Sequence, residues 1–135
     1  MASLSFGAVV TALTNGEGFF FPATILADAD DGMRIVAEEQ FGPALPVLPY
    51  DDVEEALARA NATMYGLCGS VWGADAERAT ELAERLECGV TYVNSHAELP
   101  PYMPLLGAKW SGLGVENGLD GLLAQTDRQV VYKAA

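Results

Sequence analysis

The chain has 135 residues, half of them apolar, and its 19 acidic and 7 basic side chains give a formal net charge of −12. This length suits one domain with a core of its own, because a folded chain of about 150 residues hides roughly two thirds of its unfolded surface. The acidic excess argues against a nucleic-acid backbone or an anionic membrane surface as partner. No apolar run reaches the roughly 18 to 20 residues of a membrane span, and the N-terminus lacks the basic start of a signal peptide.

Strand-like runs alternate with turns in the first third of the chain. Apolar residues predict strands over 7–13 and 19–26, and the sequence Asn-Gly-Glu-Gly between them predicts a turn. One or two helical turns are expected within 30–40, before the sequence Phe-Gly-Pro. The run 44–50 predicts a further strand, although its two prolines each remove a backbone donor and favour an edge or irregular position.

Two helices are marked by acidic N-caps and by apolar stripes. The first begins after Asp52, which as N-cap places Glu55 at the N3 position of a capping box. The second begins after Asp75 and ends before Gly89. The apolar stripes at helical spacing are Val53, Ala56, Leu57, Ala60 and Met64 in the first helix and Ala79, Leu82, Ala83 and Leu86 in the second.

The second helix joins two strand-like runs, 67–72 and 89–94. Residues 67–94 therefore predict a β-α-β unit with parallel strands and a right-handed crossover. The segment 99–118 is rich in Pro and Gly and predicts a loop, and 119–124 predicts a short helix. Together these runs predict an α/β fold with a mostly parallel sheet and flanking helices.

A last strand-like run lies at the C-terminus, from Gln129 to Lys133. A short strand at a chain end has an unpaired edge that must be covered, blunted or paired with another chain. Self-association is therefore expected.

The residues alone give no complete catalytic set. The glycines of 112–118 read GxGxxxG, one residue longer than the dinucleotide fingerprint and without a strand pattern before them, which favours a glycine-rich turn. Ser111 lies outside a GxSxG nucleophile elbow. Cys68 and Cys88 lie in apolar stretches that suit a reducing compartment, and acidic neighbours are expected to raise a thiol pKa and oppose activation.

Two carboxylates and one histidine remain as candidates for chemistry. Glu38 and Glu39 precede the Phe-Gly-Pro bend, where a carboxylate can bind a hydroxyl or act as a base, although most such pairs are solvated. His96, the sole histidine, lies in a loop just past a strand end, and with no second His or Cys near it in sequence it predicts no metal site. An acid–base enzyme that uses Glu39 and His96 stays open as a minor alternative.

Five segments resemble, in the same order, the C-terminal portion of the NAD(P)-dependent aldehyde dehydrogenase superfamily. They are GFFFPATILAD, EEQFGPALPV, EALARANATMYGLCGSVW, GVTYVNS and MPLLGAKWSGLGVENGLDGL. The resemblance runs over nearly the whole chain and implies that the family's cofactor-binding domain and first half of the catalytic domain lie outside this sequence. In that family the nucleophilic cysteine, the general-base glutamate and the oxyanion-stabilising asparagine lie upstream, so neither Cys68 nor Cys88 inherits the nucleophile's role.

The resemblance also implies roles for single residues. A glutamate in the EEQFGP motif of the family holds the nicotinamide ribose hydroxyls, and the aromatic residue two places on packs against the nicotinamide. These positions are Glu39 and Phe41, and the implied cofactor is NAD or NADP. Leu105 replaces the aromatic residue that often lines the aldehyde pocket, and His96 lies in a loop that resembles the segment beside the substrate entrance. Asn94 looks like a supporting residue.

Two functions compete on these grounds. In the first, residues 1–127 are the C-terminal part of an aldehyde dehydrogenase catalytic domain and 128–135 its terminal oligomerisation strand. The parent enzyme oxidises a small aldehyde to a carboxylic acid, and this chain alone is expected to bind no cofactor tightly and to be inactive. In the second, the chain is a non-catalytic module that kept the fold and forms a homo-oligomer through residues 129–132, from Gln129 to Tyr132. A cytoplasmic location is expected for both.

Overall fold

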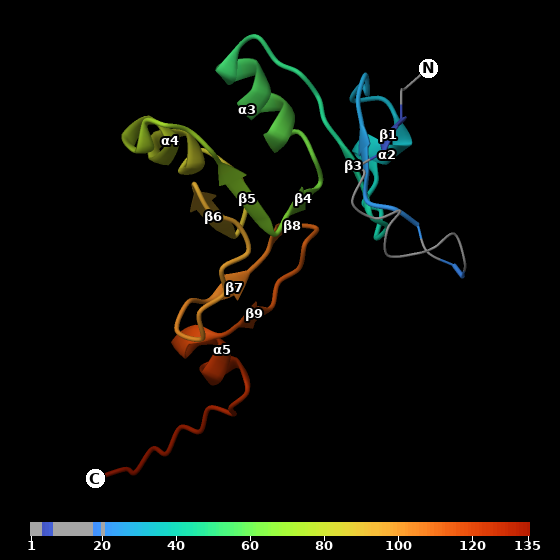
Figure 1. The fold of residues 1–135 in the computed structure, drawn as a ribbon. Coiled ribbons are helices and arrows are strands. Elements are labelled where there is room, and N and C mark those ends of the chain that lie inside the picture. The colour runs from blue at the N-terminus through green and yellow to red at the C-terminus, as the bar shows by residue number, and fades with distance from the viewer. Residues whose placement is uncertain (1–3, 7–17, 20) are drawn as a thin grey trace. The chain divides into compact units, whose positions relative to one another are not determined.

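The computed structural model describes residues 4–6, 18–19 and 21–135, so the strand predicted over 7–13 lies outside the described residues (Figure 1). The chain divides into two compact units, Met1–Asp51 and Asp52–Ala135. Along the chain the elements are β1 (Leu4–Phe6), β2 (Thr24–Leu26), α2 (Arg34–Ala37), β3 (Ala44–Pro46), α3 (Val53–Asn61), β4 (Tyr65–Gly66), β5 (Cys68–Val71), α4 (Ala76–Ala83), β6 (Val90–Val93), β7 (Leu105–Leu106), β8 (Ala108–Lys109), β9 (Val115–Glu116) and α5 (Gly118–Ala124).

The first unit contains a three-stranded sheet in the order β1-β2-β3. Strand β1 is antiparallel to β2, and β3 is parallel to β2 with Ile25 opposite Leu45. Thr24 is buried, and its hydroxyl donates to the carbonyl oxygen of Pro22 at 2.8 Å. Strands β2 and β3 are shorter than the predicted runs 19–26 and 44–50. Prolines at positions 22 and 49 account for this, because each lacks the backbone donor that a longer ladder between the two strands needs.

The second unit confirms the predicted β-α-β crossover. Strands β5 and β6 pair in parallel, and α4, which joins them, packs on both (Figure 1). Ala79 and Ala83 on α4 are buried, as are Val90 and Tyr92 on β6. Small side chains on the helix let it approach the two strands closely, and these four residues are the buried apolar core of this unit.

Both predicted N-caps are confirmed, with one correction. The Asp75 carboxylate accepts from the backbone N–H of Arg78 at 3.1 Å, three residues on, as an N-cap does. The Asp52 carboxylate accepts from the N–H of Glu54 at 3.0 Å, not from that of Glu55 as the capping-box prediction required. The Glu55 carboxylate lies 3.8 Å from the Arg59 guanidinium, one helical turn further along α3.

The predicted loop 99–118 contains three two-residue strands. Strand β8 pairs antiparallel with β4, and β7 pairs antiparallel with β9. The α/β class therefore holds, but the prediction of one mostly parallel sheet differs from the described strands, which form four small sheets. Only the β2–β3 and β5–β6 pairings among them are parallel.

The C-terminal residues 129–133 carry no strand in this structure, in contrast to the prediction. Val130, Val131 and Tyr132 are each more than four-fifths exposed. A lone strand has no ladder to stabilise it, so pairing of 129–132 with another chain stays a prediction. None of the helices in the described part of the chain is long and apolar enough to cross a membrane.

Candidate functional site

The segment between α2 and β3 carries the candidate cofactor residues. The Arg34 guanidinium donates from Nε to Glu38 Oε1 and from Nη2 to Glu38 Oε2, both at 2.8 Å. This paired hydrogen bond from Arg34 lowers the pKa of the Glu38 carboxyl. The pair ties Glu38 back onto α2, and Glu39 is the first residue beyond this attachment.

Gln40 fixes the bend that follows. Its Oε1 accepts from the N–H of Gly42 at 2.8 Å, and its Nε2 donates to the carbonyl oxygen of Ala44. The carbonyl oxygen of Pro43 accepts from the N–H of Thr24 at 2.8 Å, which holds the bend against β2. The local chain path is thus determined by one side chain and one ladder bond.

Glu39 and Phe41 lie on either side of this anchored glutamine. Glu39 is exposed, and the Phe41 side chain is 93% exposed. A carboxylate is an acceptor-only group that suits two adjacent hydroxyls, and an aromatic ring offers a flat apolar face. The two side chains therefore fit the ribose and nicotinamide end of NAD(P) in chemical type.

The glycine-rich segment 112–118 does not form a phosphate loop. Gly112 and Gly114 precede strand β9, which lies inside the motif, and Gly118 is the first residue of α5. A phosphate loop needs its glycines between a strand and a helix N-terminus without a strand between them. The favoured interpretation as a turn agrees with this arrangement.

Asn94 lies at the carboxyl ends of β5 and β6 and forms hydrogen bonds to the chain at the end of β5. Its Oδ1 accepts from the N–H of Gly73 at 2.8 Å, and its Nδ2 donates to the carbonyl oxygen of Gly73 at 2.9 Å. Its own N–H donates to the carbonyl oxygen of Val71 at 2.9 Å, and its φ of 52° lies in the left-handed region that asparagine tolerates. These contacts are those of a supporting residue, and they fix the point at which the next loop leaves the sheet.

His96 lies in that loop and is exposed. Its ring meets Tyr92 edge to face, with centroids 5.6 Å apart and planes at 64°. The Tyr92 hydroxyl donates to the carbonyl oxygen of Glu98 at 3.0 Å. Burial raises the pKa of Tyr92, and the nearby acidic groups of Cys68 and Glu98 act in the same direction. Tyr92 is therefore a neutral donor at pH 7 that holds the loop around His96.

Leu105 is half-buried in β7, near the other end of β6. The next residue, Leu106, has its carbonyl oxygen beside Gly89, where a Cβ would lie 1.8 Å away. Gly89 directly precedes β6, whereas His96 lies in the loop that follows Val93, the last residue of β6. The place of Leu105 and His96 beside the aldehyde stays a prediction. Glu39 and Phe41 belong to the first unit and these two to the second.

The sequence analysis missed a polar network that joins α3 to β8. The Asn61 side chain donates to the carbonyl oxygen of Arg85 and accepts from the N–H of Glu87, both at 2.9 Å. Lys109 Nζ donates to the carbonyl oxygen of Asn61 at 2.6 Å and lies 2.9 Å from Glu87 Oε2. No local pattern predicts these bonds, because the paired residues lie more than 20 positions apart in the sequence.

The hydroxyl of Ser111 and the thiols of Cys68 and Cys88 have structural surroundings. Ser111 Oγ accepts from the N–H of Gly66 at 2.9 Å, a structural bond across the β4–β8 pair. Cys68 and Cys88 are free and half-buried, and burial raises the pKa of both thiols. The direction is the one predicted, but the main cause is burial and not acidic neighbours, and Lys109 acts to lower the pKa of Cys88.

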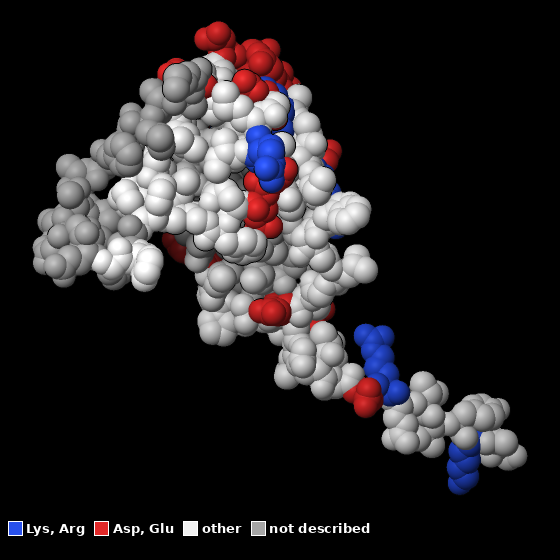
Figure 2. Space-filling model, turned by 90° about the vertical axis from the view of Figure 1, so that its right-hand side faces the viewer, with Lys and Arg blue, Asp and Glu red and all other residues white. Residues whose placement is uncertain are grey.

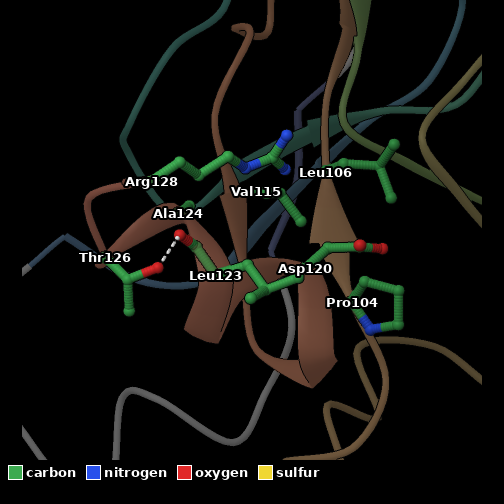
Figure 3. A pocket seen from close by; sticks show the side chains of 8 residues that line it. All are labelled: Pro104, Leu106, Val115, Asp120, Leu123, Ala124, Thr126 and Arg128. Atoms are coloured by element: carbon green, nitrogen blue, oxygen red, sulfur yellow. Dashed lines mark hydrogen bonds between the residues drawn. The ribbon is translucent and has the colours of Figure 1, made fainter. Parts of the chain in front are cut away.

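A pocket of about 600 Å³ lies beside α5 (Figure 3). It is mostly apolar, with one carboxylate, one guanidinium and one hydroxyl on its wall. The Thr126 hydroxyl donates to the carbonyl oxygen of Leu123 at 2.8 Å. The pocket contains none of the predicted site residues, although Leu106 follows Leu105 directly. The lining residues are Pro104, Leu106, Val115, Asp120, Leu123, Ala124, Thr126 and Arg128.

Four basic side chains, Arg34, Arg59, Arg85 and Lys109, lie within ion-pair distance of a carboxylate. Figure 2 shows acidic side chains gathered at the top of the view, with basic side chains beside acidic ones and no continuous basic patch on this face. The Arg85 guanidinium binds the Glu54 carboxylate in the same two-pronged way as Arg34 binds Glu38. Within the described residues no group of three or more His, Cys, Asp or Glu side chains is placed to hold a metal ion.

Known proteins share both the sequence and the fold of this chain. The sequence pattern of the aldehyde dehydrogenase family matches residues 2–131. Betaine aldehyde dehydrogenase 1 of Rhizobium meliloti (strain 1021) is 42% identical over 131 residues, which are 97% of this chain and 27% of that protein. Betaine aldehyde dehydrogenase of Agrobacterium fabrum is 40% identical over the same share of each chain.

Solved structures of aldehyde dehydrogenases are similar to this chain in both fold and sequence. The Mycobacterium tuberculosis aldehyde dehydrogenase complexed with NAD+ has a TM-score of 0.74 and 43% identity, over 78% of this chain and 22% of that one. Staphylococcus aureus betaine aldehyde dehydrogenase in complex with NAD+ has a TM-score of 0.76 and 37% identity, over 79% and 21%. The chain spans about a quarter of the length of the curated relatives it matches. Because the family pattern extends over nearly all of its sequence, the chain belongs to the aldehyde dehydrogenase family.

Proposed function

We propose that this chain is the C-terminal portion of an NAD(P)-dependent aldehyde dehydrogenase and that it holds the nicotinamide end of the cofactor. The observation that carries the proposal is the anchored bend at Gln40, with Glu39 and Phe41 exposed on either side of it. Two of the similar solved structures are complexes with NAD+, which supports the class of cofactor.

Each side chain has a defined task in this proposal. Glu39 accepts hydrogen bonds from the ribose hydroxyls, and Phe41 covers one face of the nicotinamide and keeps water from it. Leu105 and His96 border the aldehyde. The chemistry that NAD(P) supplies when bound is acceptance of a hydride.

The isolated chain is expected to have no dehydrogenase activity. Aldehyde oxidation of this type needs a thiolate nucleophile, and burial raises the pKa of both thiols of this chain, which opposes formation of a thiolate. The parent enzyme therefore takes its nucleophile and most of its cofactor site from outside these 135 residues.

A chimera tests this function. The 131 matched residues of the Rhizobium meliloti relative are replaced by this chain, and NAD binding and NAD-dependent oxidation of betaine aldehyde and of a panel of small aldehydes are measured. The proposal expects a folded chimera that binds NAD and oxidises at least one aldehyde, and no turnover by the isolated chain. A folded chimera that binds no NAD, or aldehyde oxidation by the isolated chain, contradicts it.

The exposed C-terminal tail favours a second candidate function. Val130, Val131 and Tyr132 form a short apolar run with an unpaired backbone, which suits strand addition to a second copy of the chain. In that case the chain is a homo-oligomerisation module, with or without a place in an enzyme.

A further inference from the structure

Among the described residues, strands β2 and β3 present an exposed apolar face. Ile25 on β2 and Leu45 on β3 are register partners and therefore project from the same face. Val47 lies two residues after Leu45, so its side chain projects from the same face of the strand. These three side chains, called here the apolar strip, are 52%, 63% and 49% exposed.

The opposite face of the same strands is different. Thr24 is buried there, and Leu26 and Pro46 are half-buried. Parallel strands are normally covered on both faces, and their side chains are apolar on both for that reason. The composition of β2 and β3 thus fits a sheet with two covered faces, whereas the strip side is open.

The outer edge of β3 is unsuited to pairing with a further strand. The carbonyl oxygen of Pro43 and the N–H of Val47 bond to β2, so these alternate residues direct their main-chain groups inward. Ala44 and Pro46 direct theirs to the outer edge. Gln40 already bonds the carbonyl oxygen of Ala44, and Pro46 has no N–H. A partner therefore gains little at this edge and must cover the face.

We infer that the apolar strip is the surface on which the remainder of the aldehyde dehydrogenase polypeptide packs. The strip lies within the matched residues 2–131, and the curated relatives carry about three quarters of their length outside that match. That length of chain is more than enough to cover three side chains. This inference takes the identity of the partner from the proposed function. It adds the surface of this chain that the partner contacts.

The test compares the same substitutions in two settings. Ile25→Thr keeps a β-branched side chain, and Leu45→Gln keeps the length of the side chain, so both variants leave the strands intact. The matched control is Leu113→Gln, at a fully exposed leucine in the turn before β9. Each variant is made in the isolated 135-residue chain and in the chimera with the Rhizobium meliloti relative.

In the isolated chain, the two strip variants should bind less 1-anilinonaphthalene-8-sulfonate and leave the circular dichroism spectrum unchanged. In the chimera, the same variants should lower the thermal midpoint by about 4–8 °C each, because there they remove buried apolar contacts. Leu113→Gln should lower the midpoint by less than about 2 °C.

Three results overturn the inference. The first is an unchanged thermal midpoint of the chimera for both strip variants, and the second is a midpoint decrease for Leu113→Gln as large as theirs. The third is loss of secondary structure when the strip variants are made in the isolated chain, which would assign the strip to this chain's own core. A chimera that gives no soluble protein while the relative does also counts against it. NAD binding and turnover are separate readouts, so a stable but inactive chimera rejects the proposed function and leaves the contact surface standing.

Discussion

Gly89 lies directly against the carbonyl oxygen of Leu106, and a Cβ on Gly89 would come within 1.8 Å of that oxygen. The amide of Gly89 donates to the carbonyl oxygen of Gly66 at 2.9 Å. The start of β6 is therefore held between the end of β4 and the end of β7, and only a residue without a side chain fits.

Gly89→Ala should lower the free energy of unfolding by at least about 3 kcal/mol, because both contacts at this position are to backbone, which cannot rotate away. The control is Gly114→Ala, where a Cβ meets nothing within 4 Å. It should change the free energy of unfolding by less than about 0.5 kcal/mol. Urea unfolding followed by circular dichroism measures both. Equal midpoints for the two variants would show that β6 does not pack against Leu106.

Asn94→Ala should destabilise the chain by about 2 kcal/mol, since it removes two hydrogen bonds to Gly73 and leaves alanine at a left-handed φ. Asn94→Gly removes the same bonds but accepts the φ, so its cost should be roughly half as large. The urea midpoint should be lowest for Asn94→Ala, intermediate for Asn94→Gly and highest for the parent chain. A glycine variant less stable than the alanine variant would contradict the part played by φ.

The ion pair between Glu54 and Arg85 predicts a pH dependence. The hydrogen bond from Arg85 is the main cause that lowers the pKa of the Glu54 carboxyl in the folded chain. A depressed folded pKa contributes stability that is present above the unfolded pKa and is lost as the pH falls through the folded pKa. Glu54→Gln should therefore lower the urea midpoint at pH 7, and the difference from the parent should vanish in acid.

The matched control for this pair is Glu81→Gln, an exposed glutamate on α4. This substitution should change the urea midpoint by the same small amount at pH 7 and at pH 3. A Glu54→Gln difference that stays constant from pH 7 down to pH 3 would mean that the pair contributes nothing to folding.

Removal of residues 128–135 should shift the molar mass in light scattering toward the monomer if the tail joins two copies. Val131→Pro should act in the same direction without shortening the chain, because it removes one backbone donor from the pairing strand. An unchanged mass for both variants rejects self-association through residues 129–132.

The helices and the crossover were predictable because their signals are local. Asp52 and Asp75 cap the helices that follow them, and the spacing of Ala79 and Ala83 identifies the face of α4 that packs on β5 and β6. Such patterns span about five residues, so the sequence carries them without reference to the rest of the fold.

The short strands could not be predicted, because their partners lie far away. Tyr65 pairs with Lys109, and each strand has only two residues, too few for a period-two pattern. The predicted terminal strand is not formed in the single chain for a different reason. The apolar pattern at Val130 and Val131 is clear, but a strand forms only where another strand pairs with it.

The candidate site likewise has one part that the sequence predicts and one part that it does not. The bend after Glu39 is visible as a Phe-Gly-Pro sequence, whereas the glutamine that anchors it shows no motif of its own. Gln40 bonds Gly42 and Ala44 in the folded chain, and these bonds leave the flanking side chains exposed. The roles of Glu39 and Phe41 remain predictions that rest on the family.

Two adjacent carboxylates allow the most direct test of the cofactor role. In the chimera, Glu39→Gln should raise the KM for NAD about tenfold or more, because it weakens charge-assisted bonds to two hydroxyls. Glu38→Gln removes the same charge one residue away, from a carboxylate that binds Arg34, and should change that KM less than about twofold. Equal KM values for the two variants would contradict the claim that this chain holds the nicotinamide ribose through Glu39.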